Sequence, residues 1–245
     1  MQIANKTKHI RTTMTCVLTL ILLLVNPVYG DDANDYVKLA LESSTAKKKI
    51  QHLSKAIELD SNLASAYEKR GMLYYFQEKY DKVIQDFESY TRLRPEDAEG
   101  YRMLGMSYLY NESYDAAIAN FTHALKVDPN LIKALCYRAE AYRLSGKDEA
   151  AVRDSTEVIQ QGKEGRVVAD AYITRAKVFR KIGHQKQAVA DIRAALLVDP
   201  RTWFYRYVSN YASLEDMQGA GLIVLLVIAF VLIFKLKMKL PDKDD

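Results

Sequence analysis

The side chains that most often carry catalysis or bind metals are few and scattered in this sequence. The histidines are His9, His52, His123 and His184, and they lie far apart, while Cys136 has no identifiable partner base. Zinc ligands come in closely spaced sets, which these spacings do not form. No phosphate-binding glycine loop and no Gly-x-Ser-x-Gly motif occurs. We therefore expect no enzyme activity, no catalytic residues, no cofactor, no metal and no small-molecule substrate.

The distribution of charge also argues against nucleic acid as a partner. The chain has 245 residues, is 49% hydrophobic and carries a net charge of +4. Three of these charges lie in residues 1–30 and one in residues 219–245, so residues 31–218 are neutral overall. Affinity for DNA or RNA depends mainly on contacts of Lys and Arg with phosphates. We expect a protein partner and no nucleic acid.

A repeat organises the elements that would position any binding residues. Five residues recur after 34 positions: Tyr67, Gly71, Tyr74, Phe87 and Pro95 return as Tyr101, Gly105, Tyr108, Phe121 and Pro129. The same frame returns as Ala139, Tyr142 and Ala151 and, after three extra residues, as Tyr172, Ala176, Phe179, Ala188, Ala195 and Pro200. One unit of this length cannot bury its apolar face alone, so such units stack.

The repeat resembles the tetratricopeptide repeat family, in which small and aromatic residues mark two helices and a proline closes the unit. The resemblance implies an all-α fold, a right-handed α-solenoid of antiparallel helix pairs. Small residues such as Gly105, Ala117 and Ala124 would let backbones approach, while Tyr108 and Phe121 fill the seam. We expect a degenerate repeat or cap at 31–63 and repeats at 64–97, 98–131, 132–165 and 169–202.

The 132–165 unit departs from the pattern at its end. Gly162 and Gly165 stand near the place where proline closes the other units, and three additional residues follow. Glycine ends helices without fixing the chain direction as proline does. We expect a loosened or re-angled junction there.

In resembling proteins the first helices of the pairs line a concave groove, so their exposed face implies the contact residues. Carried over by position, this face is apolar and aromatic in the first two full units and basic in the last. The candidate groove residues are Met72, Tyr75, Phe76, Arg102, Met106, Leu109, Tyr110, Arg143, Lys177, Arg180 and Lys181. A partner segment would place apolar anchors on the aromatic half and acidic groups on the basic half. The alternative for each residue is ordinary packing or a solvated charge.

The charges of the repeats have the same polarity. Residues 31–131 carry 13 basic and 17 acidic groups, whereas residues 132–218 carry 15 basic and 11 acidic groups. The two halves therefore have opposite net charge, which favours a partner that is itself charged unevenly.

The N-terminal 30 residues have the features of a secretory signal peptide. Residues 1–13 are polar and basic, Met14–Val25 is mostly apolar, and Asn26 and Pro27 interrupt it before Gly30. The apolar stretch is short for a membrane span, which needs about 20 residues. An uncleaved short anchor is the alternative interpretation.

The C-terminal region predicts a single transmembrane helix. Residues 219–234 contain no charged side chain, and extension to Met217 and Leu236 gives 20 residues, enough to cross the hydrocarbon core. Lys235, Lys237 and Lys239 follow, and lysines are retained on the cytoplasmic side. We expect a transmembrane helix at 217–236 and a cytoplasmic tail at 237–245. Residues 203–216 would form a capping helix that seals the last repeat, or else an interfacial aromatic belt.

Together these features predict a single-pass membrane protein whose repeats lie outside the cytoplasm, on the periplasmic side of a bacterial inner membrane. Its function would be that of a scaffold binding a protein or peptide segment in a concave groove. The first alternative is a holdase-like maturation or assembly factor for secreted or envelope proteins. The second is a tail-anchored adaptor facing the cytosol, which requires that residues 1–30 are not a signal.

Overall fold

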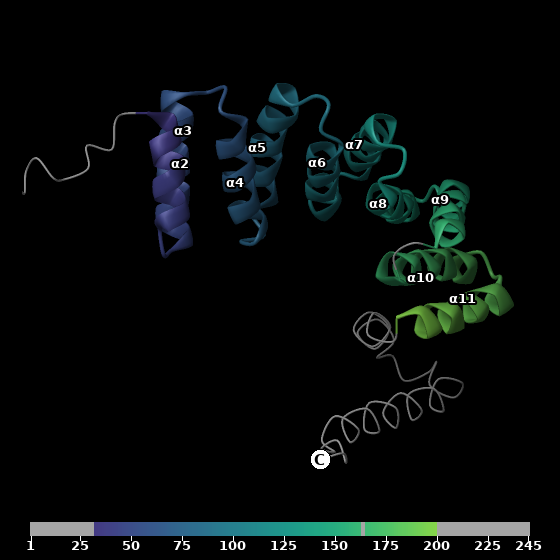
Figure 1. Cartoon of the computed structure of the whole chain (residues 1–245). Helices are drawn as coiled ribbons and strands as arrows, with labels where there is room; N and C mark the ends of the chain where they lie inside the picture. The colour runs from purple at the N-terminus through teal and green to yellow at the C-terminus, as the bar shows by residue number, and fades with distance from the viewer. Residues whose placement is uncertain (1–31, 163–164, 200–245) are drawn as a thin grey trace, which may run out of the picture. The chain divides into compact units, whose positions relative to one another are not determined.

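The structure, a computed structural model, describes residues 32–162 and 165–199. These residues form ten α-helices and no strand, which confirms the all-α expectation for this part of the chain (Figure 1). The helices are α2 (Ala33–Glu42), α3 (Ala46–Leu59), α4 (Ala64–Tyr75), α5 (Tyr80–Leu93), α6 (Ala98–Tyr110), α7 (Tyr114–Val127), α8 (Ile132–Leu144), α9 (Asp148–Gln161), α10 (Gly165–Lys181) and α11 (Gln185–Val198).

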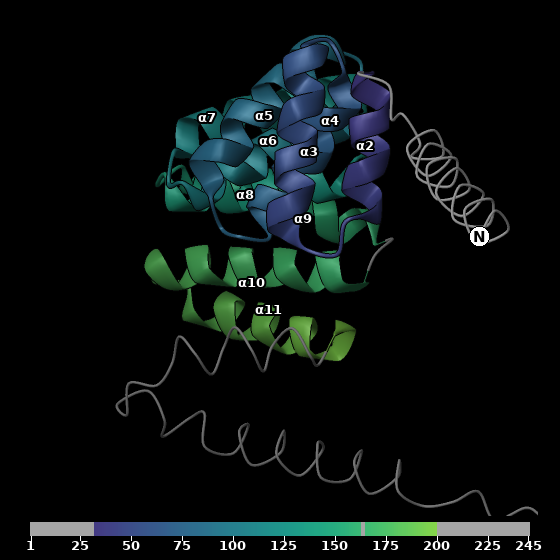
Figure 2. The same cartoon turned by 90° about the vertical axis from the view of Figure 1, so that its left-hand side faces the viewer.

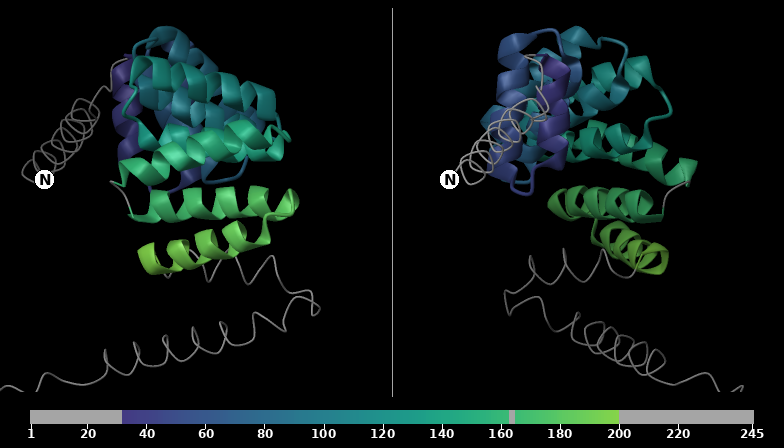
Figure 3. Two further views of the ribbon diagram at one scale, coloured as in Figure 1. Left: turned by 90° about the vertical axis from the view of Figure 1, so that its right-hand side faces the viewer. Right: turned by 60° about the vertical axis from the view of Figure 1, so that its left-hand side comes forward.

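The chain divides into two compact units at Val127 and Asp128. In the first unit each helix packs against its neighbour in sequence from α2 to α7. Figure 2 shows α2 and α3 side by side. In the second unit α8 packs on α9, and α10 packs on α8, α9 and α11; Figure 3 shows α10 and α11 side by side. Each unit is therefore a succession of helices packed on their neighbours in sequence, and the right-handed solenoid stays a prediction.

The turn inside each full helix pair has one geometry. One residue of each turn lies in the left-handed region: Glu78 at φ 57°, Glu112 at 59°, Gly146 at 77° and Gly183 at 84°. The next backbone N–H donates to the carbonyl five residues earlier, as from Lys79 to Tyr74 at 3.0 Å. This is a Schellman-type helix end, which favours glycine at the left-handed position. Two of the four turns accept a glutamate there instead.

Close approach of the two helices explains the small residues of the repeat. A Cβ placed on Gly105 would lie 2.8 Å from the Phe121 ring, and one on Gly71 would lie 2.8 Å from the Phe87 ring. Both rings are nearly fully buried, with 0% and 2% of their surface exposed. The expected seam is confirmed for Phe121, whereas Tyr108 is half-buried and its hydroxyl donates to Glu88.

Partly buried ion pairs tie the two helices together in three of the units. Arg70 donates from Nε to Asp86 at 3.0 Å, Arg138 to Asp154 at 2.7 Å, and Arg175 to Asp191 at 2.8 Å. The partners lie 16 residues apart in every case, so the pair is part of the repeat. A paired and hydrogen-bonded charge can be buried at a tolerable cost, whereas an unpaired one cannot.

Several predicted segments lie outside the described residues. These are the signal peptide at 1–30, the capping helix at 203–216, the transmembrane helix at 217–236 and the tail at 237–245. Among the helices that the structure describes, none is long and apolar enough to cross a membrane. Helix α9 ends at Gly162 in the left-handed conformation, and residues 163–164 of the expected loosened junction are likewise not described.

Candidate protein-binding surface

Four aromatic rings gather where α4 ends, α5 begins and α6 ends. The centroid of the Tyr75 ring lies 6.0 Å from Phe76, 6.3 Å from Tyr80 and 6.1 Å from Tyr110. The rings of Tyr80 and Tyr110 stack, with centroids 5.3 Å apart and planes inclined by 20°. We call these four residues the aromatic cluster. Phe76 is 75% exposed and Tyr110 is 44% exposed, so the cluster presents a large apolar surface to solvent.

Three members of the aromatic cluster were expected from the sequence, and one was missed. Tyr75 and Tyr110 lie at the ends of first helices, and Phe76 is the C-cap of α4; all three were candidates. Tyr80 is the first residue of α5, the second helix of its pair, where the resemblance implied no contact residue. The sequence does contain a signal for Tyr80. It follows Phe76 by only four residues, and the short turn between α4 and α5 keeps both residues at the same end of the helix pair.

The expected exposure of α6 is wrong. Arg102, Met106 and Leu109 retain only 8%, 5% and 8% of their surface, and Met72 on α4 is half-buried. The aromatic half of the candidate face therefore offers Phe76 and Tyr110 to solvent, whereas the middle of α6 is core. Whether any of the candidate residues binds a partner stays a prediction.

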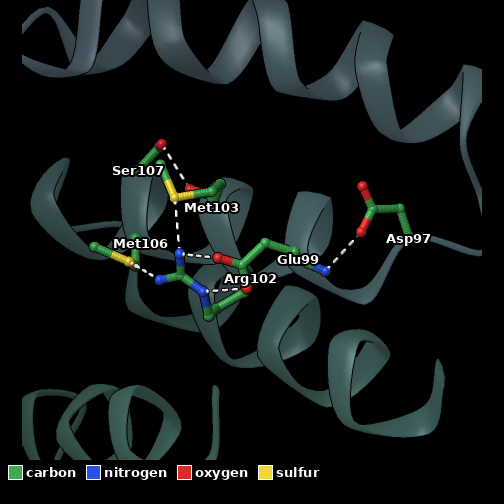
Figure 4. Close-up of polar contacts among 6 residues, drawn as sticks. All are labelled: Asp97, Glu99, Arg102, Met103, Met106 and Ser107. Carbon is green, nitrogen blue, oxygen red and sulfur yellow. Dashed lines mark hydrogen bonds and ion pairs between the residues drawn. The ribbon is translucent and has the colours of Figure 1, made fainter. Parts of the chain in front are cut away.

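Contacts within α6 explain the burial of Arg102. Figure 4 shows its guanidinium lying along the helix, held by the Glu99 carboxylate on one side. The Arg102 Nε donates to Glu99 at 2.7 Å, and its two terminal nitrogens also approach the sulfurs of Met103 and Met106. Glu99 lies in the first turn of α6, whose N-cap is Asp97. The charge of Arg102 is thus paired with a carboxylate of its own helix, which its position in the repeat did not predict.

Three of the four candidate cations of the second unit are paired with carboxylates. Arg143 donates two hydrogen bonds of 2.8 Å to Glu140, and Lys177 approaches the same carboxylate at 3.8 Å. Lys181 lies 2.8 Å from Asp148, and Arg180 is exposed. The carboxylates of Glu140 and Asp148 therefore offset part of the basic character that a count of Lys and Arg suggests.

Glu140 is the centre of this arrangement. Burial of its carboxyl group acts to raise the pKa, but hydrogen bonds from Arg143, the charges of Lys177 and Arg143, and a hydrogen bond from Thr174 outweigh burial and lower the pKa to about 2. Because Glu140 lies on α8 and Thr174 and Lys177 on α10, the carboxylate joins two first helices. It stabilises the packing of α10 on α8.

The three histidines of the described residues and Cys136 take part in packing. His123 lies against the Tyr101 ring at a centroid distance of 4.0 Å, and Cys136 is buried with its sulfur 3.6 Å from the Val167 carbonyl oxygen. Within residues 32–162 and 165–199, no group of His, Cys, Asp and Glu has the arrangement of a metal site.

Three segments of the chain match a known repeat. The profile of the tetratricopeptide repeat matches residues 64–97, 98–131 and 169–202. These three segments of the chain therefore match tetratricopeptide repeats. Among solved structures, YrrB, a TPR protein with an unusual peptide-binding site, superposes with a TM-score of 0.60 at 24% identity, over 69% of this chain and 88% of YrrB. MamA superposes with a TM-score of 0.63 at 19% identity, over 71% of this chain and 95% of MamA. At these identities the likeness concerns the fold.

A curated protein shares a shorter stretch of sequence with the chain. It is neutrophil cytosol factor 2 of Bos taurus, 52% identical over 42 residues, or 17% of this chain. The matched stretch spans only 8% of the length of that protein. The match thus indicates the repeat and not the activity of the whole relative.

Proposed function

We propose that this chain is a scaffold whose tetratricopeptide repeats bind a segment of a partner protein. The observation that carries the proposal is the aromatic cluster, in which Phe76 and Tyr110 are exposed although a monomer gains stability by burying such side chains. Exposed aromatic residues are the side chains that most often anchor a partner. The structural likeness to YrrB, a TPR protein with an unusual peptide-binding site, supports the same proposal.

The proposal includes a membrane anchor. The apolar residues 219–234 followed by Lys235, Lys237 and Lys239 support a single C-terminal span with its tail in the cytoplasm. The basic and then apolar N-terminus supports export, so the repeats would lie outside the cytoplasm, on the periplasmic side of a bacterial inner membrane. Protease added to sealed vesicles tests this topology: digestion of the repeats from the cytoplasmic side would contradict it.

The binding role is tested by removing the exposed aromatic surface. In the double variant Phe76→Ser, Tyr110→Ser, we expect crosslinking and pull-down from membranes to recover much less partner than wild type does. Both side chains are exposed, so the variant should keep its helical circular dichroism. The matched control is Leu41→Ser, because Leu41 is 62% exposed on α2 outside the aromatic cluster, and it should recover partner normally.

The result also separates the scaffold from its alternative. Stable recovery of one folded partner, lost in the double variant, supports the scaffold. Recovery of many unfolded secreted chains would instead favour the holdase. Equal recovery by wild type and a folded double variant would remove the aromatic cluster as the binding surface.

A further inference from the structure

Carboxylates flank the residues of the aromatic cluster in the sequence. The two turns that carry it, with the first helical residues after them, are residues 76–81 and 110–115, and they contain four carboxylates and one lysine. Glu78 and Glu112 are exposed at equivalent left-handed positions of these turns. The lysine, Lys79, donates to the Gln77 side-chain oxygen at 2.8 Å. The surroundings of the exposed rings are therefore acidic.

The charge of Glu78 acts on the phenol of Tyr80. Partial burial, then the negative charge of Glu78, raises the pKa of the Tyr80 phenol, with a further contribution from Tyr110. Tyr80 stacks on Tyr110, whose sequence neighbour two positions on is Glu112. Aromatic faces and carboxylates thus occur together on one end of the α4–α5 and α6–α7 pairs.

Such a surface attracts cations through two effects that add. The face of an aromatic ring carries partial negative charge and attracts an ammonium or guanidinium group, most strongly where water is excluded. The same chain already places Lys82 over the Tyr74 ring, with its nitrogen 5.2 Å from the centroid. An acidic segment would be repelled by Glu78 and Glu112, and a purely apolar segment would gain nothing from them.

We propose that the aromatic cluster binds a basic side chain, an arginine or a lysine, of the partner segment, with Phe76 and Tyr110 contacting its alkyl and charged parts and Glu78 and Glu112 balancing its charge. This rests on the proposed scaffold function and names the chemistry of the partner. It differs from the expectation of apolar anchors at this end of the chain. The basic residue would lie at the part of the segment that contacts the first unit.

The test uses three short peptides that are identical except for one central residue, arginine, leucine or glutamate. Their binding to the full-length chain is followed by NMR of the aromatic ring signals of the cluster. Cation–π attraction of about 0.5–1 kcal/mol at an exposed site corresponds to a factor of about two to five. We expect the arginine peptide to bind about fivefold more tightly than the leucine peptide, and the glutamate peptide to bind most weakly.

A variant without the two carboxylates distinguishes binding of a basic side chain from nonspecific apolar binding. In Glu78→Gln, Glu112→Gln the arginine peptide should lose about threefold in affinity, since each exposed carboxylate contributes modestly, while the leucine peptide should be unaffected. The matched control is Glu96→Gln, because Glu96 is exposed in the loop between α5 and α6 at the other end of the helices. It should change neither peptide.

Two results would overturn the inference. One is equal affinity of the chain for the arginine and leucine peptides. The other is an affinity for the arginine peptide that is the same in wild type and in the double variant Glu78→Gln, Glu112→Gln. If either occurs while Phe76→Ser, Tyr110→Ser still abolishes partner recovery, only the basic specificity is wrong. If partner recovery also survives Phe76→Ser, Tyr110→Ser, the scaffold proposal fails with it.

Discussion

The substitution Gly105→Ala tests the helix approach on which the repeat depends. Ordinary contacts between carbon atoms lie at about 3.5–4.0 Å, whereas the new Cβ would lie 2.8 Å from two atoms of the Phe121 ring. Phe121 is 0% exposed, so its ring has no free space into which to retreat. Overpacking of this kind costs about 1–3 kcal/mol.

Helix propensity opposes this cost. Replacing glycine by alanine inside a helix stabilises it by about 1 kcal/mol. Because the overlap is nearly 1 Å by the ordinary contact distance and the ring is enclosed, we expect overpacking to exceed propensity. The net effect should be a loss of up to about 2 kcal/mol in the free energy of unfolding, the difference between the overpacking and propensity terms.

Urea unfolding of the full-length chain, followed by far-UV circular dichroism, measures this effect. The control is Gly165→Ala at the start of α10, where the nearest atom to the new Cβ lies at an ordinary 3.7 Å, so stability should be unchanged or slightly higher. Adding Phe121→Leu to Gly105→Ala should recover part of the loss, because the smaller side chain makes room. A Gly105→Ala variant at least as stable as wild type would show that propensity prevails and refute the reasoning.

Two further predictions concern charge. Asp191→Asn alone should lower the free energy of unfolding by about 3 kcal/mol, because Arg175 would be left partly buried without its carboxylate. The double variant Arg175→Leu, Asp191→Asn should lower it by less than about 1 kcal/mol, because no unpaired charge remains. Thermal unfolding measures both variants. Glu140 has a folded pKa lowered from 4.5 to about 2, so its contribution to stability is complete above about pH 4.5 and is lost as the pH falls through about 2. Unfolding of wild type and Glu140→Gln should therefore differ at neutral pH and converge in strong acid; a constant difference between them would contradict this assignment.

The sequence predicts the helix pairs well because their spacing is a packing requirement. Gly71 and Gly105 recur since Phe87 and Phe121 need a bare backbone opposite them. A residue that serves a close approach must return with the period of the unit, so it is visible without a structure. Contacts that differ from unit to unit leave no periodic signal.

The candidate site was predicted less completely for this reason. Periodicity places Met106 and Tyr110 on one helix face, but it does not say that Met106 is buried and Tyr110 exposed. It assigns Tyr80 to a second helix and so misses its stacking on Tyr110. Pairing such as that of Arg143 with Glu140 depends on side-chain conformations, which a charge count ignores.

The 98–131 unit lacks the Arg–Asp ion pair that joins the two helices in the other three full units. At the positions of Arg175 and Asp191 it has Leu104 and Asn120, and the Asn120 amide donates to the Ala116 carbonyl at 2.9 Å. A buried pair that is exchanged as a whole can be neutral, whereas loss of one partner leaves an unpaired charge. Both partners are absent together here, as that argument requires.

A third position of the 98–131 frame has changed with them. Two of the arginines also donate to a hydroxyl oxygen on the preceding second helix. Arg70 donates to Ser54 and Arg175 donates to Thr156, both at 2.9 Å. In the 98–131 frame the matching residue is Glu88, which accepts a hydrogen bond from Tyr108 instead. Burial, then this bond, raises the pKa of Tyr108 to about 12, so the phenol stays a donor at neutral pH. The whole arginine network is replaced at once, and a variant that restores only an arginine at Leu104 should therefore be less stable than the wild type.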